Sequence, residues 1–166
     1  AMREDPDVIL VGEMRDAETI SMAMTAAETG HLVLGTLHTT GAVKTIDRII
    51  GALPIEEREP TKSFLSQSLL AVVTQVLCKT ADGQGRRAVC EVMVMTRAIA
   101  KLIQTDQTHQ IPSQVQMGRE FGMQMLDQAL LAAVTAKEID PDHANSFAHD
   151  KRVLQKFVTD TALVPK

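Results

Sequence analysis

Two polar side chains directly follow short apolar runs, and both are of types that act on phosphate or water. Glu13 comes after VILV at residues 8–11 and a glycine, and His38 comes after the run at residues 31–37. Neither run alternates with polar residues, which favours strands buried on both faces of a parallel sheet. Ligands bind at the carboxyl ends of such strands, so Glu13 can hold a magnesium-bound water or polarise an attacking water. Taken alone, the pattern also fits an ordinary strand followed by a solvated carboxylate.

A helix between the two strands must set their spacing. Asp16 is an N-cap residue type, and Gly30 stands where a left-handed residue would end the helix. The apolar positions recur at helical spacing and form one face, namely Ile20, Ala23, Met24 and Ala27. Strand, helix and strand within about 30 residues predict a βαβ unit with parallel strands and a right-handed crossover.

The next segments predict two helices and a hairpin. Thr39 or Thr40 can cap a helix that ends near Gly51 and Pro54. Pro60 has the position of a first-turn proline, for a helix that extends towards residue 72. Strand-like pieces at residues 74–79 and 89–95 flank DGQG at residues 82–85, which predicts a hairpin with a turn longer than two residues.

After residue 96 the chain is typical of short helices separated by glycine and proline. Asp140 followed by Pro141 predicts the start of one of them. The others are marked by apolar residues: Ile99, Leu102 and Ile103; Leu126, Leu130 and Val134; and Val153, Leu154 and Phe157. We therefore expect an α/β part over residues 1–95 and a helical part over residues 96–166.

Three stretches resemble motifs of one ATPase family. REDPDVILVGEMRD at residues 3–16 is similar to the Walker B region of the PilT-like type IV pilus retraction ATPases, within the type II/type IV secretion ATPase superfamily. TGHLVLGTLHT at residues 29–39 resembles the His box of that family, and GMQMLD at residues 122–127 resembles its C-terminal block. The resemblance implies an α/β fold: the C-terminal part of a RecA-like P-loop ATPase domain with a parallel-sheet core, followed by a helical C-terminal subdomain.

The resemblance also implies roles for individual residues. Glu13 matches the Walker B glutamate, which acts on water and, through water, on Mg²⁺. His38 matches the His-box residue that contacts the γ-phosphate region of ATP, and His31 matches the other histidine of that box. For each histidine, a hydrogen-bonded structural role at a strand end is the alternative. A zinc-type site is disfavoured, because the two histidines are seven residues apart and no cysteine cluster accompanies them.

Two further residue types in these motifs could contact nucleotide. Arg15, like Arg3, could reach phosphate at a subunit boundary, but a salt bridge with Asp16 or Glu18 is the better expectation for an arginine among acids. Thr39, next to His38, could contact nucleotide or cap the following helix, and capping is the more common role.

One family motif is altered, and one associated with export motors is missing. AIAKLIQT at residues 98–105 stands where the retraction ATPases carry AIRNLIRE, so the apolar positions are kept and the charged ones are not. That weakens the case for a retraction motor over an accessory motor. Export ATPases of the superfamily usually carry a tetracysteine zinc site, whereas this chain has two cysteines, Cys78 and Cys90. Buried free thiols are the expectation for both.

The phosphate-binding loop, GxxxxGK followed by Ser or Thr, does not occur in the 166 residues. Its N–H groups and lysine cradle the phosphates, so we expect the chain to bind ATP poorly or not at all. By resemblance, the parent protein is a hexameric ATPase that acts on an inner-membrane platform protein at the cytoplasmic base of the pilus. The alternative is a truncated, non-catalytic module that joins or caps a ring of complete subunits.

Composition excludes other classes of function. The net charge of −4, with 17 Lys and Arg against 21 Asp and Glu, provides no basic surface for nucleic acid or anionic lipid. Aromatic residues make up 2% of the chain, too few for base stacking. No apolar run approaches the roughly 20 residues that a membrane helix needs, and the first residues are polar rather than signal-like.

Overall fold

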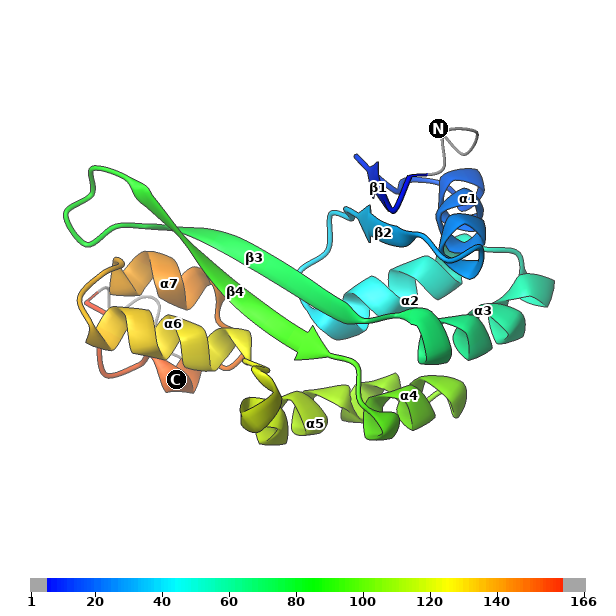
Figure 1. The fold of residues 1–166 in the computed structure, drawn as a ribbon. Coiled ribbons are helices and arrows are strands. Elements are labelled where there is room, and N and C mark those ends of the chain that lie inside the picture. Colours follow the sequence, from blue (N-terminus) through cyan, green and yellow to red (C-terminus); the bar gives the residue numbers. More distant parts are fainter. Residues whose placement is uncertain (1–5, 160–166) are drawn as a thin grey trace. The chain divides into compact units, whose positions relative to one another are not determined.

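The computed structural model describes residues 6–159 (Figure 1), so Arg3 lies outside the described residues. Two compact units are assembled from non-contiguous segments. Of the described residues, unit 1 contains 6–39, 43–70 and 95–111, and unit 2 contains 40–42, 71–94 and 112–159. The expected division into an α/β part up to residue 95 and a helical part after it stays a prediction.

Unit 1 contains the predicted βαβ arrangement. Strand β1 (Val8–Val11) pairs in parallel with β2 (Leu32–Gly35), so that Val8 is opposite Leu32 and Val11 is opposite Gly35. Helix α1 (Ala17–Glu28) connects them. This confirms the α/β fold class with parallel strands. One face of this sheet is exposed, because Val8, Leu10, Leu32 and Leu34 are each 43–71% accessible.

Helix α1 begins and ends at the predicted residues. Asp16 is its N-cap, and an Asp16 carboxylate oxygen accepts the backbone N–H of Thr19 at 2.8 Å. Gly30 has a φ of +97°, the left-handed conformation that suits glycine after a helix. The buried face consists of Ile20, Ala23 and Ala26, while Met24 and Ala27 are half-buried.

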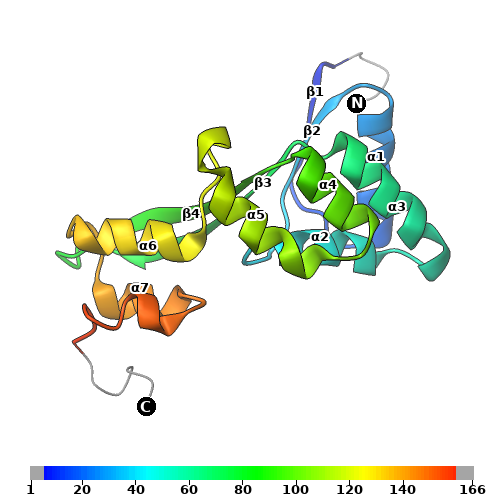
Figure 2. The same cartoon turned by 90° about the horizontal axis from the view of Figure 1, so that it is seen from below.

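Three more helices and a 3₁₀ turn lie in or extend from unit 1: α2 (Ala42–Ala52), α3 (Ile55–Ser68), α4 (Arg97–Gln104) and η1 (Thr108–Gln110). Helices α3 and α4 pack side by side, as Figure 2 shows from below. Ile99 and Ile103 of α4 are fully buried. The Lys62 ammonium of α3 reaches Asp106 at 3.0 Å, just after α4 ends.

The prediction that Pro60 starts a helix was wrong. Helix α3 begins at Ile55, five residues earlier, with Pro54 as its N-cap and Pro60 inside the helix. Pro54 presets the backbone entering the helix, and Glu56 and Glu57 place negative charge in the first turn, where the helix dipole favours it. These signals outweigh the helix bond that Pro60, which lacks an N–H, cannot make.

Unit 2 is built on the predicted hairpin. Strands β3 (Ala71–Lys79) and β4 (Arg86–Val94) are antiparallel, and both are longer than the sequence predicted. Alternate residues of β3 are buried, namely Val72, Thr74, Val76 and Cys78. Cys78 is opposite Arg87 and Cys90 is opposite Gln75, so the cysteines are not cross-strand partners and both are free. Burial raises the pKa of the Cys78 thiol.

The helical elements that follow the hairpin are α5 (Ile111–Met117), η2 (Gly118–Phe121), α6 (Leu126–Thr135), α7 (Pro141–Phe147) and η3 (Lys151–Val153). Of these, α6 packs against β4 and α7 against β3. Asp140 caps α7 as predicted, accepting the His143 N–H at 2.7 Å. The last predicted helix was wrong, because residues 151–153 form only a 3₁₀ turn. Leu154, expected on that helix, is nevertheless fully buried.

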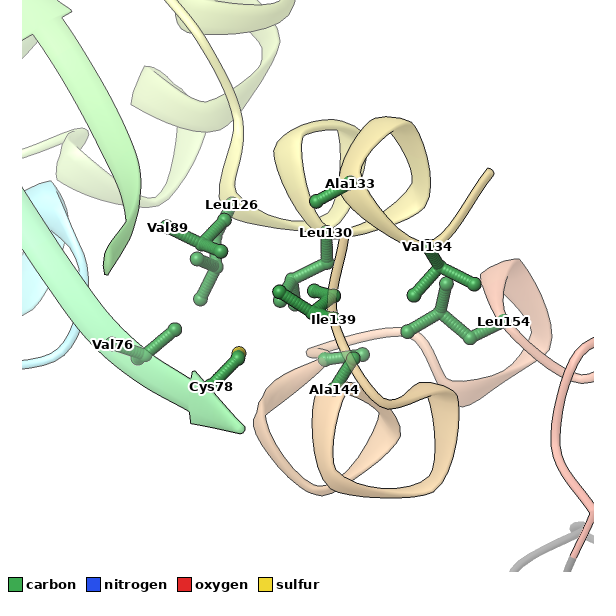
Figure 3. Packing of buried hydrophobic residues seen from close by; sticks show 11 residues of the cluster. Val76, Cys78, Val89, Leu126, Leu130, Ala133, Val134, Ile139, Ala144 and Leu154 are labelled. Carbon is green, nitrogen blue, oxygen red and sulfur yellow. The ribbon is translucent and has the colours of Figure 1, made fainter. Parts of the chain in front are cut away.

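Figure 3 shows the core of unit 2. Leu130 of α6 and Ile139 lie at its centre, with Cys78 of β3 and Ala144 of α7 on one side and Val134 and Leu154 on another. These aliphatic side chains explain how a chain with few aromatic residues forms a core. Within residues 6–159, no helix has the length and apolar content needed to cross a membrane.

Candidate active site

Backbone contacts join the loops that follow β1 and β2. The Met14 N–H donates to the carbonyl of Thr36 at 2.9 Å, and the Thr36 hydroxyl donates back to the carbonyl of Gly12. Because the strands are parallel and end side by side, these bonds hold the residues after β1 against those after β2. They position Glu13 next to the segment that leads to His38.

The side chain of Met14 lies over Gly35, the last residue of β2. A Cβ atom at position 35 would lie 2.6 Å from the Met14 Cε and 2.9 Å from its Sδ. Glycine is therefore required for this close approach while Met14 keeps its conformation.

Glu13, Arg15 and His38 form one cluster. His38 Nε2 lies 2.7 Å from Glu13 Oε1, and the Nε of Arg15 contacts the same oxygen. The Glu13 side chain is 26% exposed, whereas those of Arg15 and His38 are 75% and 83% exposed. A partly shielded carboxylate is thus held by two nitrogen groups that remain open to solvent.

The charges in this cluster favour an ionised Glu13. The Arg15 guanidinium bound to its carboxylate lowers the pKa of Glu13, and His38 lowers it further, against an opposing effect of burial. Reciprocally, Glu13 raises the pKa of Arg15. Glu13 is therefore a hydrogen-bond acceptor near neutral pH, able to orient a water molecule or accept a proton from one.

Arg15 has a different partner from those expected. It pairs with Glu13 and not with Asp16 or Glu18. Asp16 uses its carboxylate as the N-cap of α1, where the N–H of Thr19 is the chief cause of a lowered Asp16 pKa. Sequence order alone could not distinguish these acids, because the turn after β1 decides which of them faces Arg15.

His31 lies at the opposite end of β2 from His38. Its Nδ1 is 2.9 Å from the carbonyl of Ala26 and 3.0 Å from the Thr29 hydroxyl, at the end of α1. The structure thus does not bring His31 to Glu13, and its contacts are those of a hydrogen-bonded structural histidine.

Thr39 contacts the helix after it through a side-chain hydrogen bond. Its hydroxyl oxygen lies 2.7 Å from that of Thr45, in the first turn of α2. Helix α2 starts only at Ala42, so Thr39 lies between His38 and the helix, and Thr40 is exposed. Thr39 therefore follows His38 directly in the sequence, and its side chain is held by a residue of α2.

A shallow pocket of about 340 Å³ adjoins the cluster through Arg15. Its lining includes Asp16 and the α2 residues Asp47, Arg48 and Gly51. Sequence reasoning singled out neither Asp47 nor Arg48, since two charged neighbours on a helix carry no signal by themselves. In the described part of the chain, no three His, Cys, Asp or Glu side chains gather as a metal site.

The chain is similar to proteins of pilus and secretion machines. It is 53% identical over 150 residues to the twitching motility protein of Neisseria gonorrhoeae, covering 90% of this chain and 40% of that protein. It is 52% identical over 148 residues to the type IV pilus retraction ATPase PilT of Pseudomonas aeruginosa, covering 89% and 43%. The chain thus spans less than half the length of these relatives.

A solved structure of a pilus motor is also similar to this chain. The crystal structure of the pilus retraction motor PilT with bound ADP superposes with a TM-score of 0.82 at 39% identity, over 93% of this chain and 43% of that one. Residues 1–141 match the model of a protein family described as Type II/IV secretion system protein. With the parallel strands, the Glu13–His38 cluster and these similarities, the chain belongs to the Type II/IV secretion system protein family and is PilT-like.

Proposed function

We propose that this chain forms the water-activating side of an ATP-hydrolysing motor that powers type IV pilus retraction. The observation that carries the proposal is the contact of 2.7 Å between Glu13 and His38, made at the carboxyl ends of adjacent parallel strands. Catalytic carboxylates of α/β ATPases act from this edge of the sheet. The similarity to the P. aeruginosa retraction ATPase supports the kind of motor.

The three clustered side chains have distinct roles in this proposal. Glu13 orients the attacking water and, as an ionised carboxylate, can accept its proton. His38 fixes the Glu13 carboxylate and presents a ring to the γ-phosphate region. Arg15 balances the charge of Glu13 and, being 75% exposed, is free to turn towards phosphate. Thr39, next to His38, would support the nucleotide side, whereas His31, at the opposite end of β2, would keep its hydrogen-bonded role at the end of α1.

ATP and Mg²⁺ are the proposed cofactors. Magnesium in such enzymes neutralises phosphate charge, and proteins usually hold it through one or two carboxylates together with waters and substrate phosphates. Glu13 fits this requirement as a single carboxylate that would hold the ion through water. Its surroundings do not fit a metal bound by protein side chains alone, since the described residues offer no three-ligand group.

Assembly and location follow from the same resemblance. We place the motor in a homo-hexamer, in the cytoplasm at the base of the pilus, acting on an inner-membrane platform protein. Helix α4 departs from the pattern of the retraction motors. Its buried residues Ile99 and Ile103 keep the apolar pattern, whereas exposed Gln104 and Thr105 replace the charged residues of retraction motors.

The decisive experiment uses a chimera in which this chain replaces the matching C-terminal part of the P. aeruginosa relative. The chimera should hydrolyse ATP, and Glu13→Gln should lower kcat by about 100-fold or more, as loss of a general base does. Nucleotide affinity should remain, because Glu13 does not hold the base or sugar. Glu28→Gln, an exposed change at the end of α1, is the matched control. Unchanged turnover in Glu13→Gln would remove Glu13 from the mechanism.

The alternative is a non-catalytic module that joins or caps a ring of complete subunits. Titration of the chain with magnesium-ATP should show no binding in the micromolar range. Mixing it with complete P. aeruginosa subunits then separates the two proposals. Ring incorporation with a reduced ATPase rate, together with an inactive chimera, would support the module over the motor.

A further inference from the structure

A buried carboxylate in unit 2 lies outside the cluster described above. Glu91 of β4 is 5% exposed. Its Oε1 accepts the backbone N–H of Ala42 at 2.8 Å, and its Oε2 accepts that of Leu126 at 3.4 Å. Ala42 and Leu126 are themselves 1% and 3% exposed, so water cannot replace these bonds readily.

Both amides are the first of a helix, since α2 starts at Ala42 and α6 starts at Leu126. The first N–H groups of a helix have no partner within it and carry partial positive charge. Met125, at the N-cap of α6, provides no side-chain acceptor. One glutamate therefore supplies an acceptor and negative charge at the starts of two helices that are distant in sequence.

The position of Glu91 is fixed by its own surroundings. The next residue, Val92, exchanges two backbone hydrogen bonds of 2.9 Å with Gln124, which lies two residues before Leu126. Gly41 has a φ of +109°, and a Cβ there would lie 3.7 Å from Glu91 Oε1. The chain can therefore approach the carboxylate closely at Gly41 and enter α2 in the strained conformation that glycine allows.

The segment held by Glu91 follows His38 directly. Only Thr39, Thr40 and Gly41 separate His38 from Ala42. The bond from Thr39 to Thr45 fastens the same segment to the first turn of α2. A shift in the start of α2 would therefore be passed along a short, doubly fastened stretch of backbone to the histidine that contacts Glu13.

We propose that Glu91 is a positioning residue for hydrolysis, which fixes the start of α2 and, through residues 39–42, the place of His38. The proposal rests on the proposed ATPase function. It differs from a purely structural role because it predicts an effect on turnover and on His38, and not on stability alone.

The first test measures turnover of the chimera. Glu91→Met keeps an unbranched side chain but removes both acceptors, and Glu91→Gln keeps one. Because Glu91→Met removes the acceptors of both helix-start amides, it should lower kcat at least about tenfold. The KM for ATP should stay within about twofold, since ground-state binding is untouched. Glu91→Gln should lie between the wild type and Glu91→Met, and Glu120→Gln, exposed on η2, should match the wild type.

The second test uses the 166-residue chain itself and needs no catalysis. The imidazole resonances of His38 and the amide exchange rate of Ala42 are followed by NMR. Both should change in Glu91→Gln, with Glu120→Gln as the control. Thermal unfolding of the same samples separates a local change from global destabilisation, so a variant Glu91→Met that does not fold leaves the test intact.

The outcomes separate the two proposals. Normal kcat and unchanged His38 resonances in the Glu91 variants, even with a lower Tm, would overturn the positioning role. If the unsubstituted chimera hydrolyses no ATP, the proposed function fails. The positioning of His38 is then decided by NMR alone, and unchanged His38 resonances in Glu91→Gln would overturn it as well.

Discussion

Glu13 shares one carboxylate oxygen between an arginine two residues later in its own loop and a histidine from the next strand. The arginine contact is local and the histidine contact depends on the fold. Arg15 is the largest cause of the lowered Glu13 pKa, and His38 contributes less. The local contact therefore has the larger effect on the acidity of the carboxyl group.

Replacing Arg15 by Gln should therefore raise the pKa of Glu13 towards the ordinary glutamate value of about 4.3. A lowered pKa in the folded state contributes stability above the unfolded value, and that stability is lost as pH falls through the folded pKa. Arg15→Gln should thus shift the acid-side loss of stability to higher pH. An NMR titration of the Glu13 carboxyl carbon checks this, with Lys44→Gln, exposed on α2, as the control. An unchanged titration midpoint would contradict the assignment.

At this scale the sequence predicted the residue types but not all of their partners. The strand pattern and the family resemblance brought Glu13 and His38 to one edge, and the structure places them in contact. The partner of Arg15 depended on Asp16 being occupied as a helix cap, which is a competition between neighbouring acids. His31 lies in the same motif as His38, yet the length of β2 separates the two histidines.

Among the elements, α3 carries a local conflict that can be tested. Pro60 inside this helix lacks the N–H that would bond to the carbonyl of Glu56. Pro60→Ala should restore the bond and raise the free energy of unfolding by about 1–2 kcal/mol. The helix preference for alanine is about 3 kcal/mol, reduced by the extra freedom of the unfolded chain.

Urea denaturation of the wild type and Pro60→Ala measures the difference. Pro54→Ala is the matched control, since Pro54 stands at the N-cap and should gain no helix bond. A loss of stability in Pro60→Ala would show that the proline fits its surroundings better than the helix geometry implies.

The elements that the sequence predicted well are those with local signals. Asp16 and Asp140 are side-chain caps whose bonds span three residues, so their effect is visible in a short window. Helix α3 starts after Pro54 and not at Pro60. Proline is common at helix starts, so the sequence alone did not distinguish the two prolines. Leu154 is buried by tertiary packing without a helix, which no periodicity could predict.

At the level of the whole molecule, the two compact units allow a prediction about where stability lies. Leu130 is fully buried at the centre of the unit 2 core. Leu130→Ala should cost about 2–5 kcal/mol of unfolding free energy, from lost burial and the cavity left behind. Leu131→Ala, on the same helix but half-buried, should cost less.

Hydrogen exchange resolves the effect by region. Amides of β3 and β4 should lose protection in Leu130→Ala more than those of α3 and α4, because the first pair belongs to unit 2 and the second to unit 1. Equal loss throughout would mean that the chain unfolds as one cooperative body.

The exposed apolar face of the β1–β2 sheet predicts self-association of the chain. Leu10 is 71% exposed and Leu34, its partner in register, is 51% exposed. Exposed apolar strands of this kind invite contact between molecules. The double change Leu10→Gln and Leu34→Gln should lower the weight-average molar mass measured by sedimentation equilibrium. Ile55→Gln, also at a highly exposed position, should not. Equal association in all three proteins would exclude this face.

The contact of Met14 with Gly35 has a consequence for how this sequence can evolve. A side chain at position 35 meets the flexible end of Met14, so a change at position 35 requires the Met14 side chain to move. Gly35→Ala alone should be destabilising, and Met14→Ala should relieve it, giving a favourable coupling in a double-mutant cycle. Met14 directly follows the proposed catalytic glutamate. The loop that positions Glu13 therefore limits which residues can replace Gly35 in β2.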